Sequence, residues 1–341
     1  MHAAVAALEY YLPAATLSGQ DLAAEFPAWW VKNIENTTGI QNRHISGPDE
    51  CASDLAVAAA QKLFDSGACR PESIDFLLLC TQSPDYFSPT TACLLQDRLG
   101  IPTTAGALDF NLGCSGYVYG LGLAEGLITS GQASTILLLT SDTNTKVVHP
   151  KDKSTRTILG DGAAATLLTA SDVTKPLLGP FVYGTDGKGA NNLIVPIGGF
   201  RRPRSRQEPP EICDENGNVR TEENLCMNGM KVFEFAQARV PESMNALLAK
   251  SGATMANIDL FIFHQANRYM LEQLRRGLNI PQEKFQLTLA HCGNTGSSSI
   301  PIALKHALME GRVKPGSVLA LVGFGVGFSW GATLLRWAGN A

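Results

Sequence analysis

The sequence IDFLLLCTQ at residues 74–82 returns as IDLFIFHQA at residues 258–266. Each apolar run has the length and composition of a buried strand, and each is followed by a helical pattern that ends in a Leu/Gly/Ile segment. Two further pairs of segments repeat in the same order, at an offset of a little over half the chain. These are LDFNLGCSG (108–116) with LTLAHCGNTG (287–296), and STILLLTSD (134–142) with SVLALVGFG (317–325). Such internal repetition indicates two copies of one unit, packed about a pseudo-two-fold axis.

Strands alternate with helical patterns along the chain, which predicts an α/β fold with mainly parallel strands. Residues 51–67 have helical periodicity and end at Gly67, a residue suited to a helix C-terminus, and 73–80 follows as a strand. We therefore predict an N-terminal half at residues 1–172 and a C-terminal half at residues 173–341.

Composition narrows the possible functions. The 341 residues are 45% hydrophobic and 17% charged with a net charge of −4, so the chain can bury a large core and lacks the basic face of a nucleic-acid-binding protein. The one basic run, RRPRSR at 201–206, is followed by several acidic residues. It is either a solvated loop or a binding site for phosphates or an acidic protein.

The apolar segments and the cysteines do not indicate secretion, membrane insertion or metal binding. The N-terminus carries Glu9 and lacks a basic leader region, so we expect a cytoplasmic protein. The uncharged run at 317–335 is broken by four glycines into strand, loop and strand, and we expect no membrane segment. The eight cysteines form no CxxC pair and no metal-ligand spacing, so each is judged singly.

Three polar residues fall at predicted strand ends, where ligands gather in α/β sheets. Cys114 and Asn294 occupy matching positions of the repeat, each among glycines, and His264 ends the strand that matches 74–80. Each alone has a structural explanation: a small buried thiol, a turn asparagine and a core histidine. Because the duplication brings matching strand ends together, we predict that the three share one pocket.

Cys114 has the setting of a nucleophile. A strand-to-helix turn offers unpaired backbone N–H groups and the positive end of a helix, which predicts a lowered thiol pKa. Gly113 and Gly116 permit a sharp turn and close approach of a substrate. The other seven cysteines are expected to be structural.

Seven motifs, taken with their order and spacing, resemble the β-ketoacyl-ACP synthase III family of thiolase-fold condensing enzymes over essentially the whole chain. They are TGIQNRHI (38–45), FNLGCSGYVYGL (110–121), GDGAAA (160–165), MNGMKVFEFA (227–236), HQAN (264–267), GNTGSSSIPIAL (293–304) and GFGVGFSWGA (323–332). The resemblance implies a layered αβαβα arrangement of two duplicated α/β halves. It also implies a Cys-His-Asn triad at Cys114, His264 and Asn294.

The resemblance further implies a two-stage reaction without a cofactor or metal, on thioesters of coenzyme A or phosphopantetheine. Cys114 takes an acyl group from a thioester, with the backbone N–H groups of Cys114 and Val326 as the oxyanion hole. Malonyl-ACP then binds, and His264 and Asn294 stabilise its enolate as carbon dioxide leaves. The implied partners are acyl carrier protein, acyl-CoA and a second copy of the chain.

The resemblance assigns binding roles to further residues, with departures from the family pattern. Phe87 in YFSP (86–89) matches a residue that reaches the partner subunit's acyl pocket. The family's adenine-stacking tryptophan registers on Asn33, with Trp29 and Trp30 upstream, and its arginine registers on Lys153, close to Arg156. The predicted substrate-binding and carrier-binding residues are Phe87, Lys153, Arg156, Gln265, Asn267 and Arg268. Because Asn33 and Lys153 cannot sandwich an adenine, we expect acyl-ACP to compete well with acyl-CoA as donor.

Three alternatives to the main interpretation remain open. The first is a specialised family member that serves secondary metabolism or polysaccharide acylation. The second is a thioester hydrolase with a Cys-His-Asn triad, and the third is a non-catalytic scaffold of thiolase fold. The length of the acyl chain depends on the packing around the pocket.

Overall fold

The computed structural model describes residues 1–207 and 209–339, and its first half is built on a five-stranded sheet. The strand order is β1-β7-β6-β4-β5, with β4 parallel to β5 and β6, and β7 antiparallel to β6 and β1. The strands are β1 (His2–Tyr11), β4 (Phe76–Cys80), β5 (Gly106–Phe110), β6 (Thr135–Asp142) and β7 (Gly162–Ser171).

The second half repeats this sheet with one strand fewer. Its order is β13-β14-β15-β8, and the parallel and antiparallel pairs match those of β4-β6-β7-β1. The strands are β8 (Leu178–Thr185), β13 (Leu260–Phe263), β14 (Val318–Gly325) and β15 (Ser329–Arg336). In place of β5, a single parallel bridge joins Phe261 to Phe285. The predicted duplication is therefore confirmed, and the predicted boundary at 172/173 lies between β7 and β8.

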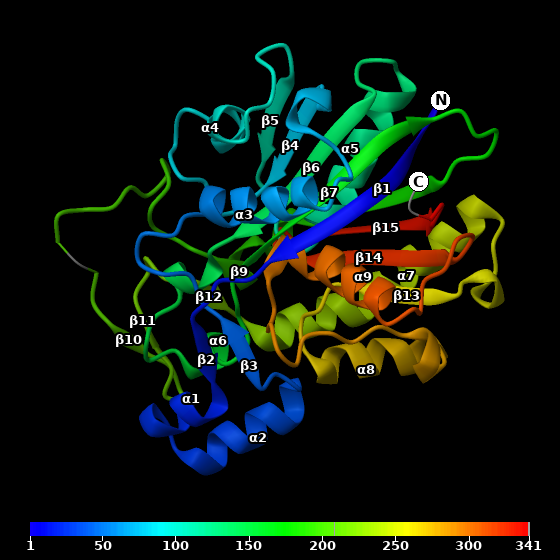
Figure 1. Cartoon of the computed structure of the whole chain (residues 1–341). Helices are drawn as coiled ribbons and strands as arrows, with labels where there is room; N and C mark the ends of the chain where they lie inside the picture. The colour runs from blue at the N-terminus through cyan, green and yellow to red at the C-terminus, as the bar shows by residue number, and fades with distance from the viewer. Residues whose placement is uncertain (208, 340–341) are drawn as a thin grey trace.

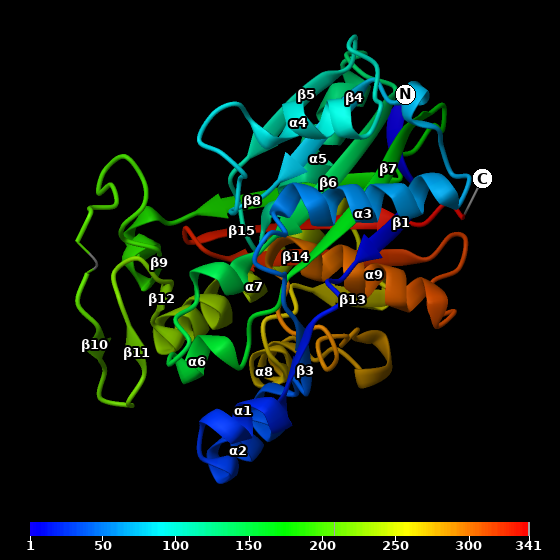
Figure 2. The ribbon, with the colours of Figure 1, turned by 60° about the vertical axis from the view of Figure 1, so that its left-hand side comes forward.

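The helices form three layers around the two sheets (Figures 1 and 2). Helices α5 (Gly116–Thr129) and α9 (Ser299–Met309) lie between the sheets and contact strands of both. Helices α3 (Ala52–Asp65) and α4 (Thr91–Arg98) cover the outer face of the first sheet, and α7 (Gly229–Ser251) and α8 (Arg268–Gly277) cover that of the second. This is the αβαβα arrangement predicted from the resemblance.

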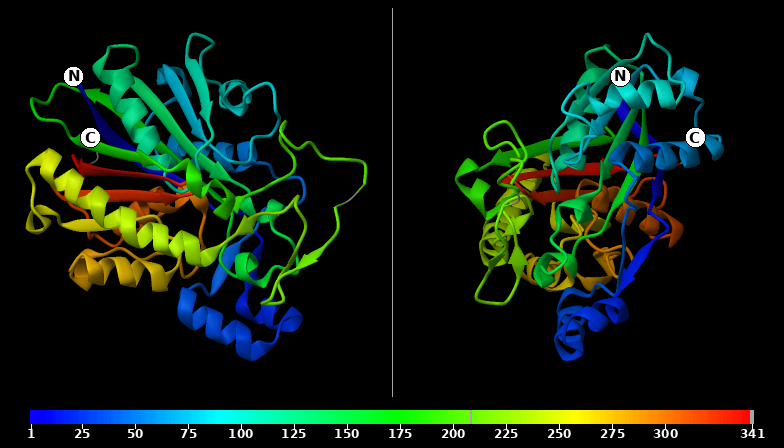
Figure 3. Two further views of the ribbon diagram at one scale, coloured as in Figure 1. Left: turned by 180° about the vertical axis from the view of Figure 1, so that it is seen from behind. Right: turned by 90° about the vertical axis from the view of Figure 1, so that its left-hand side faces the viewer.

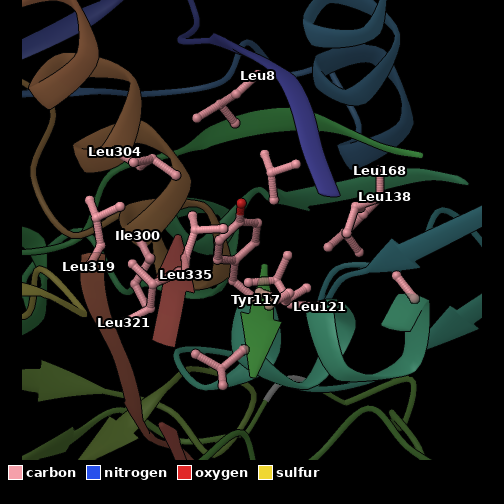
Figure 4. Close-up of a cluster of buried hydrophobic side chains, with 14 of the residues drawn as sticks. Leu8, Tyr117, Leu121, Leu138, Leu168, Ile300, Leu304, Leu319, Leu321 and Leu335 are labelled. Carbon is pink, nitrogen blue, oxygen red and sulfur yellow. The ribbon is translucent and has the colours of Figure 1, made fainter. Parts of the chain in front are cut away.

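The core between the sheets explains why α5 and α9 are mostly apolar or small in sequence, with Lys305 of α9 paired with Glu9 at the edge of the core. Tyr117 and Leu121 of α5 meet Ile300 and Leu304 of α9, and leucines of both sheets close around them (Figure 4). A helix buried on all sides needs apolar or small residues all round. The central layer therefore holds both helix N-termini rigidly at the junction of the halves.

Smaller elements surround one end of the sheets (Figure 3). The excursion at residues 195–226 projects from the body of the chain, and α1 and α2 form a separate helical hairpin. These elements are β2 (Thr16–Ser18), α1 (Gly19–Glu25), α2 (Ala28–Thr38), β3 (Asn42–His44), α6 (Lys153–Arg156), β9 (Leu193–Ile194), β10 (Ile212–Cys213), β11 (Val219–Arg220) and β12 (Cys226–Met227). Within the described residues, no helix is both long and apolar enough to cross a bilayer.

Candidate active site

The three predicted catalytic residues line one cavity of about 640 Å³, at the junction of the two halves. Cys114 lies in the turn between β5 and α5, His264 follows the last residue of β13, and Asn294 lies in the loop that leads to α9. The connections that place them are the repeated segments of the sequence. The structure thus brings together three side chains that are as much as 180 positions apart.

Two backbone amides approach the thiol of Cys114. The N–H groups of Cys114 and Val326 both lie within hydrogen-bonding reach of its sulfur. Their approach depends on Gly325, because a Cβ there would lie 2.8 Å from both Cβ and Sγ of Cys114. The sequence therefore needs glycine at 325 for the two glycine loops to meet. Two backbone N–H groups directed at one position are the donors that an oxyanion hole requires.

The prediction of a lowered thiol pKa is wrong. Burial raises the pKa of Cys114 to about 12, and the nearby Asp142 carboxylate raises it further, while the two backbone amides lower it only in part. Desolvation outweighs the N-terminus of α5, which begins two residues later at Gly116. The nucleophile therefore rests as a thiol.

His264 is buried and neutral. Burial lowers the pKa of His264 to about 3, and the Gly296 backbone opposes this shift. Its Nδ1 lies 2.7 Å from Oγ of Ser299, which also accepts the backbone N–H of Gln265 at 3.3 Å. Because that oxygen already accepts a proton, its own hydroxyl can donate to Nδ1. In that tautomer the ring carries its proton on Nε2, the nitrogen left for a substrate.

Asn294 is held by one end of its carboxamide. Its Oδ1 accepts the backbone N–H of Gly296 at 3.0 Å, which orients the Nδ2 amide as the free donor. Gly296 has a φ of +59°, and a Cβ there would lie 2.8 Å from Asp142 Oδ2. Only glycine fits this turn without strain, so GNTG at 293–296 is a requirement of the loop that presents Asn294.

Asp142 is a functional candidate that the sequence analysis missed. It ends β6, is fully buried, and joins loops of both halves. Its carboxylate accepts the N–H of Gln82 at 2.8 Å and both the N–H and the hydroxyl of Ser297, at 3.1 and 2.5 Å. Burial raises the pKa of Asp142 to about 6, against these hydrogen bonds. Ser299 was missed as well, and the run GSSS was its only signal.

Of the predicted binding residues Asn267 and Gln265, the first lines the cavity and the second is buried outside it. Asn267 lines the cavity and caps α8 through Oδ1, which accepts the N–H of Met270 at 2.9 Å. Gln265 is 1% exposed, and its carboxamide bonds to the backbone of Phe263, Gln286 and Thr288. Gln265 therefore holds the chain that leads to Asn294, and the structure leaves its side chain no group for a ligand.

The cations predicted at the nucleotide and carrier sites already have protein partners. Nζ of Lys153 donates to the Asn216 carbonyl at 3.0 Å, and Arg156 forms a two-pronged ion pair with Glu25. Arg268 is exposed and donates to the Asn36 carbonyl. Asn33 lies exposed on α2. The side chain of Trp29 lies outside the described residues, whereas Trp30 is half-buried and the ammonium of Lys153 lies 5.3 Å from the centroid of its ring.

Phe87 does not line the cavity of its own chain. Its side chain is 78% exposed and contacts Phe200, which is 91% exposed, with ring centroids 5.4 Å apart. Phe200 lies in the excursion directly before RRPRSR, so the two rings form an exposed apolar pair. Among the described residues, no cluster of three or more His, Cys, Asp or Glu side chains could hold a metal ion.

Comparison with known proteins gives one consistent result. Residues 108–187 match the family model of 3-oxoacyl-[acyl-carrier-protein] synthase III, and residues 248–337 match the model of its C-terminal part. The chain is 35% identical to the β-ketoacyl-[acyl-carrier-protein] synthase III of Xanthomonas euvesicatoria, over 99% of both chains, and 33% identical to that of Caldanaerobacter subterraneus, over 96% of both. It belongs to the β-ketoacyl-ACP synthase III family.

Solved structures agree with this assignment. A 3-oxoacyl-(acyl-carrier-protein) synthase III crystal structure is 51% identical and superposes with a TM-score of 0.97, over 99% of this chain and 100% of that chain. The corresponding synthase of Burkholderia xenovorans is 34% identical, with a TM-score of 0.90 over 99% and 95%. The resemblance and the thiolase fold are confirmed, and the chain is a condensing acyltransferase of the type that initiates fatty-acid synthesis.

Proposed function

We propose that Cys114 accepts the priming acyl group and that His264 and Asn294 activate malonyl-ACP against it. The observation that carries this proposal is the convergence on one cavity of a thiol with two backbone donors and, opposite it, two neutral side-chain donors.

In the first half-reaction, the sulfur of Cys114 attacks the carbonyl carbon of the donor thioester. The N–H groups of Cys114 and Val326 hold the resulting oxyanion, and they also stabilise the thiolate that forms as the thiol loses its proton. Collapse of the intermediate breaks the bond to the carrier sulfur, which leaves as a thiol with that proton. The acyl group remains on Cys114.

In the second half-reaction, the malonyl carboxylate leaves as carbon dioxide and its bonding electrons pass to the α-carbon. The enolate oxygen receives hydrogen bonds from Nε2 of His264 and Nδ2 of Asn294. Neither donor needs a charge, which agrees with the lowered pKa of His264. The carbanion attacks the acyl carbon, the bond to Cys114 breaks, and the β-ketoacyl product leaves on the carrier.

We also propose a cytoplasmic location, and three arrangements of side chains support a carrier protein as donor and a homodimer as the working form. Lys153 and Arg156 are engaged by Asn216 and Glu25, so neither is free for the nucleotide of coenzyme A. Arg268 is exposed at the start of α8, next to the cavity-lining Asn267, and suits the acidic surface of a carrier. The apolar pair Phe87–Phe200 suits burial by a second copy.

Intact-mass analysis after incubation with matched acyl-CoA and acyl-ACP tests the proposal. We expect one acyl group per chain, on Cys114, formed at least as fast from acyl-ACP as from acyl-CoA. A hydrolase would instead release free acid without consuming malonyl-ACP. Acylation of Cys292, or a clear preference for the CoA form that is lost on mutating Trp29 or Trp30, would contradict the respective assignments.

A further inference from the structure

The cavity that contains Cys114 has two sides of different chemistry. On one side it is lined by the starts of α7 and α8, including Val232, Asn267 and Met270. On the other it is lined by the loops that follow β4 and β6, at residues 82–85 and 143–147. If the carrier docks on the exposed arginines of α8, its thioester enters along the first side. The acyl chain beyond Cys114 then meets the two loops.

Each of these loops presents a carboxamide close to a catalytic loop. Gln82 packs on Gly113, the residue before Cys114, and a Cβ on Gly113 would collide with its carboxamide oxygen. Asn144 packs on Gly296, where a Cβ would lie 2.8 Å from Nδ2. The two glycines therefore leave space that these carboxamides fill. Gly113 directly precedes Cys114, Gly296 follows Asn294 by two residues, and both carboxamides line the same cavity as Cys114.

Gln82 is exposed and Asn144 is half-buried, and neither carboxamide has a protein hydrogen-bond partner in the part of the chain that the structure describes, so water serves both. An alkyl chain that filled this side of the cavity would remove them from water without replacing its hydrogen bonds, which is unfavourable. An acyl group with its own oxygen would restore these bonds, since a carboxamide both donates and accepts.

The charged groups nearby are already engaged. Asp85 accepts the N–H and the hydroxyl of Ser53, at 3.2 and 2.6 Å, and Lys146 donates to the Pro48 carbonyl at 2.8 Å. The donors and acceptors that stay free on this side of the cavity are therefore uncharged. This side suits a hydroxyl or keto oxygen better than a carboxylate or an amine.

We propose that the priming acyl group of this enzyme is short and carries a hydroxyl or keto oxygen on its third or fourth carbon, bound by Gln82 and Asn144. This inference rests on the proposed function, because it concerns the group that Cys114 accepts. It distinguishes this chain from a synthase primed by a plain alkyl chain.

The test measures the rate of Cys114 acylation by intact mass with five thioesters on one carrier. The probes are acetyl, butyryl, 3-hydroxybutyryl, 3-oxobutyryl and 4-hydroxybutyryl. We expect at least one oxygenated probe to react about tenfold to a hundredfold faster than butyryl, a range typical of leaving buried polar groups unpaired. Butyryl reacting as fast as all three oxygenated probes would overturn the inference. Acetyl is too short to reach the carboxamides, so its failure to label Cys114 would contradict the proposed function itself.

Two near-isosteric substitutions locate the effect. In the double variant Gln82→Met/Asn144→Leu, butyryl should react at least as fast as the oxygenated probes. The control variant Gln132→Leu/Asn245→Leu removes two exposed carboxamides far from the cavity and should keep the original preference. A preference that survives in the Gln82/Asn144 variant would show that other groups select the acyl chain.

Discussion

The loops that carry Cys114 and Asn294 occupy the same place in the two halves and perform different chemistry. In the first half, β5 leads directly into the Cys114 turn, and backbone amides surround the sulfur. In the second half, β5 is replaced by the single bridge at Phe285, and a longer loop presents a carboxamide beside His264. Duplication supplied two equivalent strand ends, and the local side chains made one nucleophilic and the other a donor of hydrogen bonds.

The largest effect should come from removing the nucleophile of the first half. Cys114→Ala abolishes acylation, because no other described thiol lies in the oxyanion hole. Cys292→Ala is the matched control, since Cys292 is the buried cysteine of the second-half loop and its thiol donates to the Thr288 carbonyl at 3.4 Å. Mass analysis should show one acyl group on the control and none on Cys114→Ala. An acyl group on Cys114→Ala would show that a residue other than Cys114 is the nucleophile.

The next largest effect should come from removing a hydrogen-bond donor of the second half, which should slow one half-reaction and leave the other intact. His264→Ala and Asn294→Ala should each retain acylation of Cys114 and lose malonyl-ACP decarboxylation by about 10²–10³-fold, the usual cost of one oxyanion donor. Release of ¹⁴CO₂ from labelled malonyl-ACP measures the second step by itself. Decarboxylation at the parent rate in either variant would remove that residue from the enolate site.

A smaller effect should follow from loosening the second half without removing a donor. Ser299→Ala deletes the group that holds Nδ1 of His264, so decarboxylation should fall by about tenfold with the malonyl-ACP KM nearly unchanged. Acylation should stay normal. Ser299→Thr, which keeps a hydroxyl, should recover part of the rate, whereas a general defect of folding would lower both steps together.

The smallest effect should appear where the halves are joined. Asp142→Asn removes the negative charge that raises the pKa of Cys114, so that pKa falls and alkylation by iodoacetamide at pH 8 should speed up about severalfold. The pKa of Asp142 itself is about 6, so its charge is present above that pH and lost below it. The two proteins should therefore converge in relative reactivity as the pH falls below 6. Equal rates at pH 8 would show that the carboxylate only positions Gln82 and Ser297.

The repeat, the strand ends and the nucleophile were predictable because each depends on local sequence. Apolar runs such as 74–80 and 258–264 form strands wherever they lie, and Gly325 and Gly296 mark the turns that bring the catalytic groups together. The motifs around Cys114, His264 and Asn294 therefore identify the family without coordinates, and the triad at these residues stays a prediction.

Other properties exist only in the folded chain. The pKa of Cys114 was predicted with the wrong sign, because desolvation depends on all the atoms around the sulfur and the helix N-terminus on only a few. Asp142 and Gln82 carry no motif, and their roles arise when loops from both halves pack against each other. Gln265 sits within a recognised motif, yet its side chain turns into the core to hold a loop. The sequence by itself determined which chemical groups lie at the strand ends. Tertiary packing decided the protonation and orientation of those groups and the polarity of the cavity, because all three properties depend on contacts between segments distant in the sequence.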